Sequence, residues 1–217
     1  MTDPTYTHWA LIVDRSGSMQ RIVDDMNGAI TTLLQDQRRV PGKLLIDITT
    51  FDDKIEFVGR DLDADAALQL GPLVNPRGAT ALLDAIGATV VRLGEHLAKM
   101  SEDQRPSKVL ITIVTDGMEN SSKEWTLRDV NTRINTQREQ FAWEFMFLGA
   151  NMDAVNVAAG MGIPGSSTMS YHTTGAGVAS TMSAVSAQTT RYRSAGPGGQ
   201  SISFTDEDRE AAMDGEQ

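Results

Sequence analysis

Two stretches of the chain have the pattern of buried strands, and each ends on an acidic side chain. Residues 9–14 (WALIVD) and 108–116 (KVLITIVTD) are rich in branched apolar residues and end on Asp14 and Asp116. A carboxylate buried there without a partner would cost on the order of several kcal/mol. If the two strands are neighbours in a parallel sheet, both carboxylates point into one crevice beyond the strand ends. A shared cation would then offset the two like charges.

Strand and helix patterns alternate along nearly the whole chain. This alternation is typical of an α/β fold with a mostly parallel, doubly wound sheet and helices on both faces. Asp52 and Asp53 form a tight turn, so the second and third strands are expected to pair as an antiparallel hairpin at a sheet edge. Strands are expected over residues 9–14, 41–51, 54–59, 108–115, 141–150 and 167–172. Helices are expected over residues 19–34, 62–70, 81–100, 127–140, 152–162 and 175–193.

Two helix starts carry a specific prediction. Thr126 followed by Asp129 resembles a capping box, and Asn151 is expected to cap the next helix. The periodic pattern supports one domain over residues 5–193. The remaining residues, 194–217, are expected to form a tail that is mobile or packs peripherally.

Composition narrows the function classes. The formal net charge of −10 argues against nonspecific nucleic-acid binding. The absence of cysteine excludes disulfides and thiolate metal sites, and it fits a reducing compartment. The N-terminal residues lack a signal-peptide pattern, and no stretch is long enough to span a membrane. These features predict a cytoplasmic protein.

Three hydroxyl side chains accompany the two carboxylates. Ser16 and Ser18 follow Asp14 in DRSGS, and Thr80 lies in RGATALLDA, just before a helical pattern. Ser18 or Thr80 alone is better explained as a helix N-cap. The five oxygen side chains together suit a hard divalent cation.

This ordered set resembles the metal-ion-dependent adhesion site (MIDAS) of the von Willebrand factor type A (VWA) family. The pattern is Asp-x-Ser-x-Ser, a distant Thr and a distant Asp, and the resemblance extends over roughly residues 5–193. It implies a Rossmann-like six-stranded sheet of order 3-2-1-4-5-6 with strand 3 antiparallel. It also implies a member of the intracellular bacterial or phage type. The expected ion is Mg²⁺, with Mn²⁺ or Ca²⁺ as alternatives. Ser16, Ser18 and often Thr80 would bind it directly, with Asp14 and Asp116 acting largely through water.

The predicted chemistry is binding rather than catalysis. Such an ion keeps an open position that a partner protein's Asp or Glu fills, with no role for nucleic acid or membrane. The oligomeric state is left open. Arg15, in the variable slot of the motif, is expected either to repel a basic partner or to bind a carboxylate.

Two other functions remain open. The same oxygens would suit a metal-dependent phosphohydrolase with Glu119 as general base. Alternatively, the ion only staples loops in a structural subunit. The three histidines, His8, His96 and His172, lie in no metal or triad motif and are expected to be packing or surface residues.

Overall fold

The chain folds around one six-stranded sheet of order β3-β2-β1-β4-β5-β6. A computed structural model describes residues 3–150, 152–196 and 200–214. β3 is antiparallel to β2, and all the other neighbouring strands are parallel. The strands are β1 (Asp3–Asp14), β2 (Leu44–Phe51), β3 (Ile55–Leu62), β4 (Pro106–Thr115), β5 (Glu144–Ala150) and β6 (Thr168–Tyr171). The predicted fold class, strand order and edge hairpin are confirmed.

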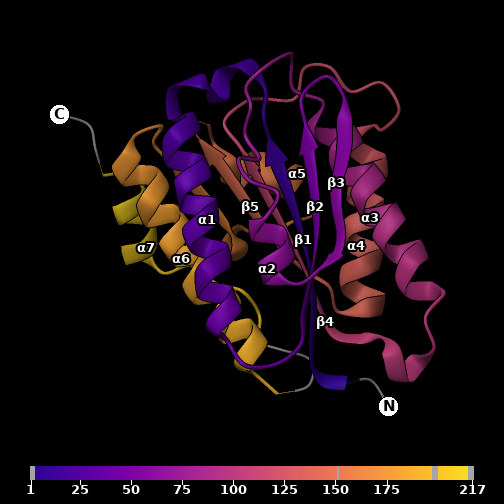
Figure 1. The fold of residues 1–217 in the computed structure, drawn as a ribbon. Coiled ribbons are helices and arrows are strands. Elements are labelled where there is room, and N and C mark those ends of the chain that lie inside the picture. The colour runs from indigo at the N-terminus through magenta and orange to yellow at the C-terminus, as the bar shows by residue number, and fades with distance from the viewer. Residues whose placement is uncertain (1–2, 151, 197–199, 215–217) are drawn as a thin grey trace.

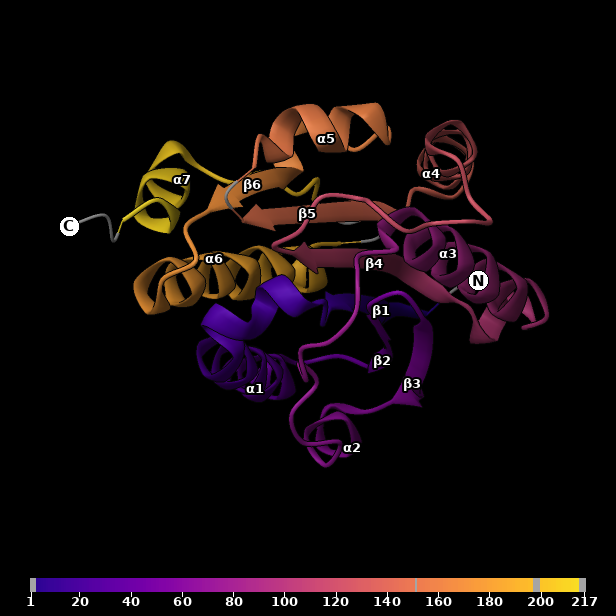
Figure 2. The same cartoon turned by 90° about the horizontal axis from the view of Figure 1, so that it is seen from above.

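Helices cover both faces of the sheet (Figures 1 and 2). One face carries α1 (Val23–Arg39), α2 (Ala64–Leu68), α6 (Gly175–Ser194) and α7 (Asp206–Ala212), and the other carries α3 (Leu82–Ala98), α4 (Leu127–Phe141) and α5 (Ala154–Gly160). Along β1, Trp9 and Leu11 face the first layer, whereas Ala10 and Ile12 face the second. Because both faces are buried, the strand is apolar without alternation from Trp9 to Val13.

The starts of α1 and α5 differ from the predicted ones for identifiable reasons. A 3-10 turn over Gly17–Ile22 precedes α1, so this helix begins at Val23 rather than at residue 19. The backbone N–H of Gly17 donates to Gly78 O at 3.2 Å, which ties this segment to a distant loop before the helix can begin. The Asp153 side chain caps α5, and the predicted cap, Asn151, lies outside the described residues.

The Thr126–Asp129 capping box at the start of α4 is confirmed. In the C-terminal segment, Ile202 and Phe204 are buried, and α7 begins with a second capping box. Arg209 of α7 donates hydrogen bonds to backbone carbonyls next to β6, including those of Gly165 and Thr168. The described part of this tail therefore packs against the sheet edge. No helix in the described ranges has both the length and the apolar character needed to cross a bilayer.

Candidate metal centre

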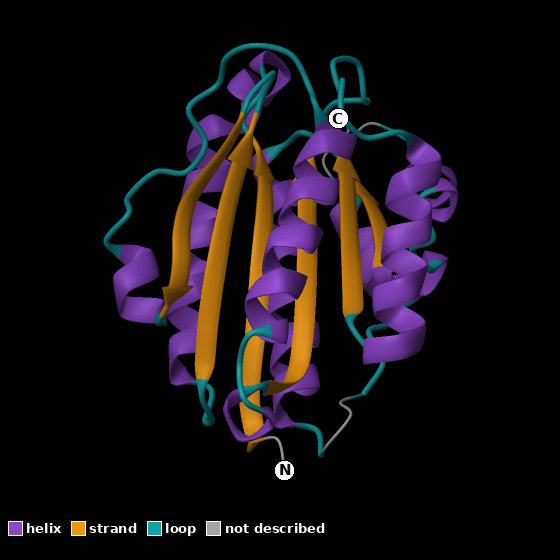
Figure 3. Cartoon of the chain, turned by 90° about the vertical axis from the view of Figure 1, so that its right-hand side faces the viewer, coloured by secondary structure: helices purple, strands orange, loops and turns teal. Residues whose placement is uncertain are grey.

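The strands other than β3 point the same way, so the loops that follow them gather at the carboxyl end of these strands (Figure 3). Asp14 is the last residue of β1, and Asp116 follows β4. These strands are hydrogen-bonded neighbours, with Val13 opposite Val114. The fold thus places the two predicted carboxylates at adjacent strand ends.

The three predicted hydroxyls lie beside these carboxylates. Ser16 Oγ and Ser18 Oγ are 3.0 Å apart, and Ser18 Oγ donates to Asp116 Oδ1 at 2.6 Å. A Cβ added to Gly117 would lie 2.8 Å from Thr80 Oγ1 and 3.3 Å from Ser18 Oγ. The structure therefore brings all five predicted side chains together.

Thr80 is held in place by a residue that the sequence analysis did not identify. Asn120 accepts the Thr80 N–H through its side chain at 2.9 Å, and its own N–H donates to Thr80 O at 3.0 Å. The segment after β4 is thereby joined to Thr80, two residues before α3. An isolated Asn in a loop gives no sequence signal for this role, because its partner is 40 residues away.

The two carboxylates of this centre are more easily protonated than in water. Asp14 is fully buried, and its pKa is raised to about 6, mainly by burial and to a smaller extent by the Asp116 charge, despite hydrogen bonds from Thr115 and Ser16. Burial also raises the pKa of Asp116, although the hydrogen bond from Ser18 opposes the shift. Burial disfavours the charged form of both carboxyl groups, and a nearby positive charge would favour it. A cation at this position would supply that charge.

The donor set fits a hard divalent ion. It consists only of hydroxyl and carboxylate oxygens, which are the ligand types that Mg²⁺ and Ca²⁺ prefer. The space beside Thr80 and Ser18 exists because residue 117 is a glycine, since a methyl group would crowd both oxygens. Ser18 is exposed, so this cradle opens to solvent.

Arg15 points into a separate cluster, the arginine network of Arg15, Arg77, Asp52 and Glu56. Arg15 Nε donates to Asp52 Oδ2 at 3.0 Å, and its Nη1 donates to Glu56 Oε2 at 2.8 Å. Arg77 Nε donates to the same Asp52 oxygen at 2.6 Å. Of the two predicted roles of Arg15, the structure shows carboxylate binding, and the carboxylates are the chain's own.

Glu119 is fully occupied by hydrogen bonds. Its Oε1 accepts the N–H groups of Ser121 and Ser122, and its Oε2 accepts the Leu83 N–H and the Ser122 hydroxyl, at 2.7–2.9 Å. Asp84 acts similarly, accepting backbone N–H groups of residues 123–125. Both carboxylates tie the loop after β4 to the first turn of α3.

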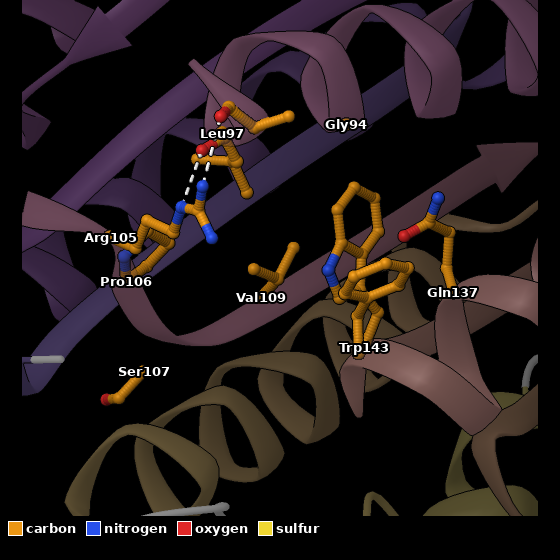
Figure 4. A pocket seen from close by; sticks show the side chains of 10 residues that line it. Gly94, Leu97, Arg105, Pro106, Ser107, Val109, Gln137 and Trp143 are labelled. Carbon is orange, nitrogen blue, oxygen red and sulfur yellow. Dashed lines mark hydrogen bonds between the residues drawn. The ribbon is translucent and has the colours of Figure 1, made fainter. Parts of the chain in front are cut away.

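A pocket lies at the opposite end of the sheet, between α3, α4 and the start of β4 (Figure 4). Leu97, Val109 and Trp143 line it, together with Arg105. The Arg105 guanidinium donates to backbone carbonyls at the end of α3, including Leu97 O at 3.0 Å. None of the five predicted metal-site residues lines this pocket.

No protein-family model and no curated protein matches the chain. Solved structures do match its fold. The vWF domain of the type V pili tip protein Mfa5 from Porphyromonas gingivalis superposes with a TM-score of 0.65 at 10% identity, covering 94% of this chain and 99% of that one. This agreement shows the VWA fold.

Two further structures cover less of the matched protein. Proximal thread matrix protein 1 from the mussel byssus, with a zinc-occupied MIDAS motif, has a TM-score of 0.64 at 13% identity over 86% of this chain and 46% of that chain. A von Willebrand factor type A protein from Catenulispora acidiphila has a TM-score of 0.60 at 14% identity over 85% and 43%. The chain thus spans less than half the length of these two proteins.

Proposed function

We propose that this chain is a metal-dependent protein-binding module. A divalent ion, Mg²⁺ in the first instance, is held by Asp14, Ser16, Ser18, Thr80 and Asp116, and a partner protein contributes an Asp or Glu. The observation that carries the proposal is the fully buried Asp14 and the partly buried Asp116, both with raised pKa values, beside three hydroxyls at the solvent-open carboxyl end of the strands. The VWA fold and the zinc-occupied MIDAS of the mussel protein support it.

The residues around the centre suit docking. When bound, the ion supplies a position that an outside carboxylate can fill with a charge-assisted contact. Ser18 leaves the centre open to solvent, and Met118 beside it is 68% exposed. A partner's acidic side chain would therefore reach the ion while apolar groups around it cover Met118.

The two alternative functions receive less support. A phosphohydrolase needs a general base with a free oxygen, but both oxygens of Glu119 already accept hydrogen bonds. An ion whose only role is to hold loops together would add little, because these loops are already joined by hydrogen bonds. Asn120, Glu119 and Asp84 already join the loop after β4 to the Thr80 region without one.

Affinity capture in Mg²⁺ buffer tests the proposal. The expected result is a partner that elutes with chelator and that the Asp14→Ala variant does not retain. Asp24→Ala is the matched control, because it removes the same charge from an exposed position in α1 and should capture the partner normally. Full retention of the partner in chelator, or by Asp14→Ala, would contradict the proposal.

A further inference from the structure

A second group of ligand-type side chains lies between the sheet and α3. It contains His8 of β1, Asp47 of β2, Asp61 near the end of β3, and His96 of α3. Within the described residues, one ligand atom each of His8, Asp47 and Asp61 lies within 4.8 Å of the others. We call these four residues the histidine cluster. Four different elements contribute one residue each, so the cluster is a product of the tertiary fold.

Two pairs of ligand atoms are spaced as around a single ion. His8 Nε2 lies 3.1 Å from Asp47 Oδ1, and His96 Nε2 lies 3.0 Å from Asp61 Oδ1. Tetrahedral zinc binds nitrogen and oxygen at about 2.0–2.2 Å, which places neighbouring ligand atoms roughly 3.3 Å apart. The two imidazole ring centres are 6.2 Å apart, so both rings can reach the same small volume.

His8 is the most informative member of the cluster. Its side chain is fully buried, yet Nε2 makes no hydrogen bond, because its ring is not oriented for one despite the short distance to Asp47. A buried polar atom without a hydrogen bond is unfavourable by about 1–3 kcal/mol. Nε2 faces Asp47, and Asp61 Oδ1 lies 4.0 Å from Nδ1 of the same ring, so a cation beside the ring would have both carboxylates within reach.

The other ring nitrogen of His8, Nδ1, already has a hydrogen-bond partner. His8 Nδ1 lies 3.2 Å from Tyr6 Oη. Burial raises the pKa of Tyr6 to about 12, with the charges of Asp61 and Asp47 adding to the shift, so the phenol stays neutral and can accept a hydrogen bond. Histidines that bind metals usually donate their second ring N–H to such an oxygen, which fixes the tautomer and presents the other nitrogen to the ion.

We propose that His8, Asp47, Asp61 and His96 form a second metal site, for Zn²⁺ or a similar transition-metal ion. Two imidazoles and two carboxylates are the nitrogen and oxygen donors that such ions favour over Mg²⁺. A divalent cation balances the two carboxylate charges. The side chains of His96 and Asp61 are 19% and 35% exposed, which gives the ion a way in.

The histidine cluster is distinct from the candidate metal centre. His8 precedes Asp14 by six positions on the same strand, or roughly 20 Å at the usual rise per residue. The two sites also differ in donor chemistry, because the candidate metal centre offers only oxygen. Bound at the cluster, an ion would join the edge hairpin of β2 and β3 to α3.

Imidazole NMR of the full chain tests the proposal, because the chain has only three histidines. One equivalent of Zn²⁺, added with saturating Mg²⁺ present, is expected to shift the ring nitrogens of His8 and His96 and leave His172 unmoved. The Asp14→Ala variant, which disables the other centre, should give the same shifts. Unmoved His8 and His96 signals would overturn the proposal and leave the cluster as a hydrogen-bonded ion-pair network.

Calorimetry on variants gives the second readout. His96→Gln and Asp61→Asn alter partly exposed positions and are expected to weaken Zn²⁺ binding at the cluster at least about tenfold without unfolding the chain. His172→Gln is the matched control and should bind Zn²⁺ as the unmodified chain does. Zn²⁺ affinity that is unchanged in both His96→Gln and Asp61→Asn would refute the assignment.

Discussion

Two pairs of acidic side chains lie near each other at the carboxyl end of the parallel strands. Their surroundings shift the pKa values of the two pairs in opposite directions. In the arginine network, Asp52 and Glu56 accept hydrogen bonds from Arg15 and Arg77. The bond from Arg15 lowers the pKa of Glu56 to about 2, with Arg77 adding to the shift. Burial alone would raise the pKa of Asp52, but Arg77, the Lys54 backbone N–H and the Arg15 charge outweigh it and keep it low.

Among the described residues, no arginine donates a hydrogen bond to Asp14 or Asp116, and Arg21 acts on Asp116 only through its charge. Asp14 and Asp116 receive hydrogen bonds from hydroxyl and backbone donors only, and both pKa values are raised. Arg15 directly follows Asp14 in the chain, but it donates to Asp52 and Glu56 instead. The comparison teaches that neighbouring carboxylates can be neutralised by the chain's own cations or left for an external one. Position in the sequence does not decide which.

The largest expected effect is at Asp52. Asp52→Asn would leave the buried Arg15 guanidinium without its buried partner, which should lower the free energy of unfolding by about 3 kcal/mol. Chemical denaturation measures this. Asp65→Asn is the control: its ion pair with Arg38 is more than half exposed, so the loss should stay below about 1 kcal/mol. If Asp52→Asn has the same free energy of unfolding as the unmodified chain, the arginine network does not stabilise the fold.

Asp14→Asn should have the opposite sign. In chelator at pH 7.5, the variant is expected to be more stable than the unmodified chain by about 1–2 kcal/mol, because a buried charge is removed. Mg²⁺ should no longer raise its melting temperature. Denaturation with and without Mg²⁺ checks both points, and a loss of stability in chelator would remove the contrast with Asp52.

Gly117→Ala sharpens the comparison without changing any charge. The new methyl group would lie 2.8 Å from Thr80 Oγ1, so the hydroxyl must move away from the ion. Mg²⁺ affinity in calorimetry is expected to fall by about tenfold, or about 1.4 kcal/mol. Gly28→Ala is the matched control, since a Cβ there meets nothing within 4 Å. If Gly117→Ala binds Mg²⁺ with unchanged affinity, the ion does not bind beside Thr80 and Gly117.

The smallest expected effect is the pH dependence. The folded pKa of Asp14 lies above its unfolded value, so in chelator the stability should rise by about 1 kcal/mol as the pH falls from 7 to 5.5. The folded pKa of Glu56 lies below its unfolded value, so its contribution is present above about pH 4.5 and is lost toward pH 2. Denaturation across pH should show a maximum, and Asp14→Asn should remove the rise. A stability that falls steadily from pH 7 would contradict the raised pKa of Asp14.

Much of the fold could be predicted from local patterns. The apolar runs ending on Asp14 and Asp116 predicted two buried strands, and the Asp52–Asp53 turn predicted the edge hairpin. That the two buried strands are neighbours followed only from the strand order that the VWA resemblance implies. The Thr126 capping box could be found because both of its partners lie within four residues. The late start of α1 could not be predicted from the sequence, because Gly17 is constrained by a hydrogen bond from its N–H to the carbonyl oxygen of Gly78, which is distant in the chain.

The sequence by itself determined the fold class and the five oxygen side chains at the candidate metal centre. Periodicity and strand ends are local properties, and parallel strands necessarily bring their carboxyl ends to one edge. Only the tertiary structure decided that Arg15 pairs with Asp52 and Glu56 and that His8 and His96 meet Asp47 and Asp61. These contacts depend on strand register and on where α3 crosses the sheet. The strand register and the position of α3 are set by the packing of the whole core. The partners of these residues therefore cannot be identified from local sequence patterns.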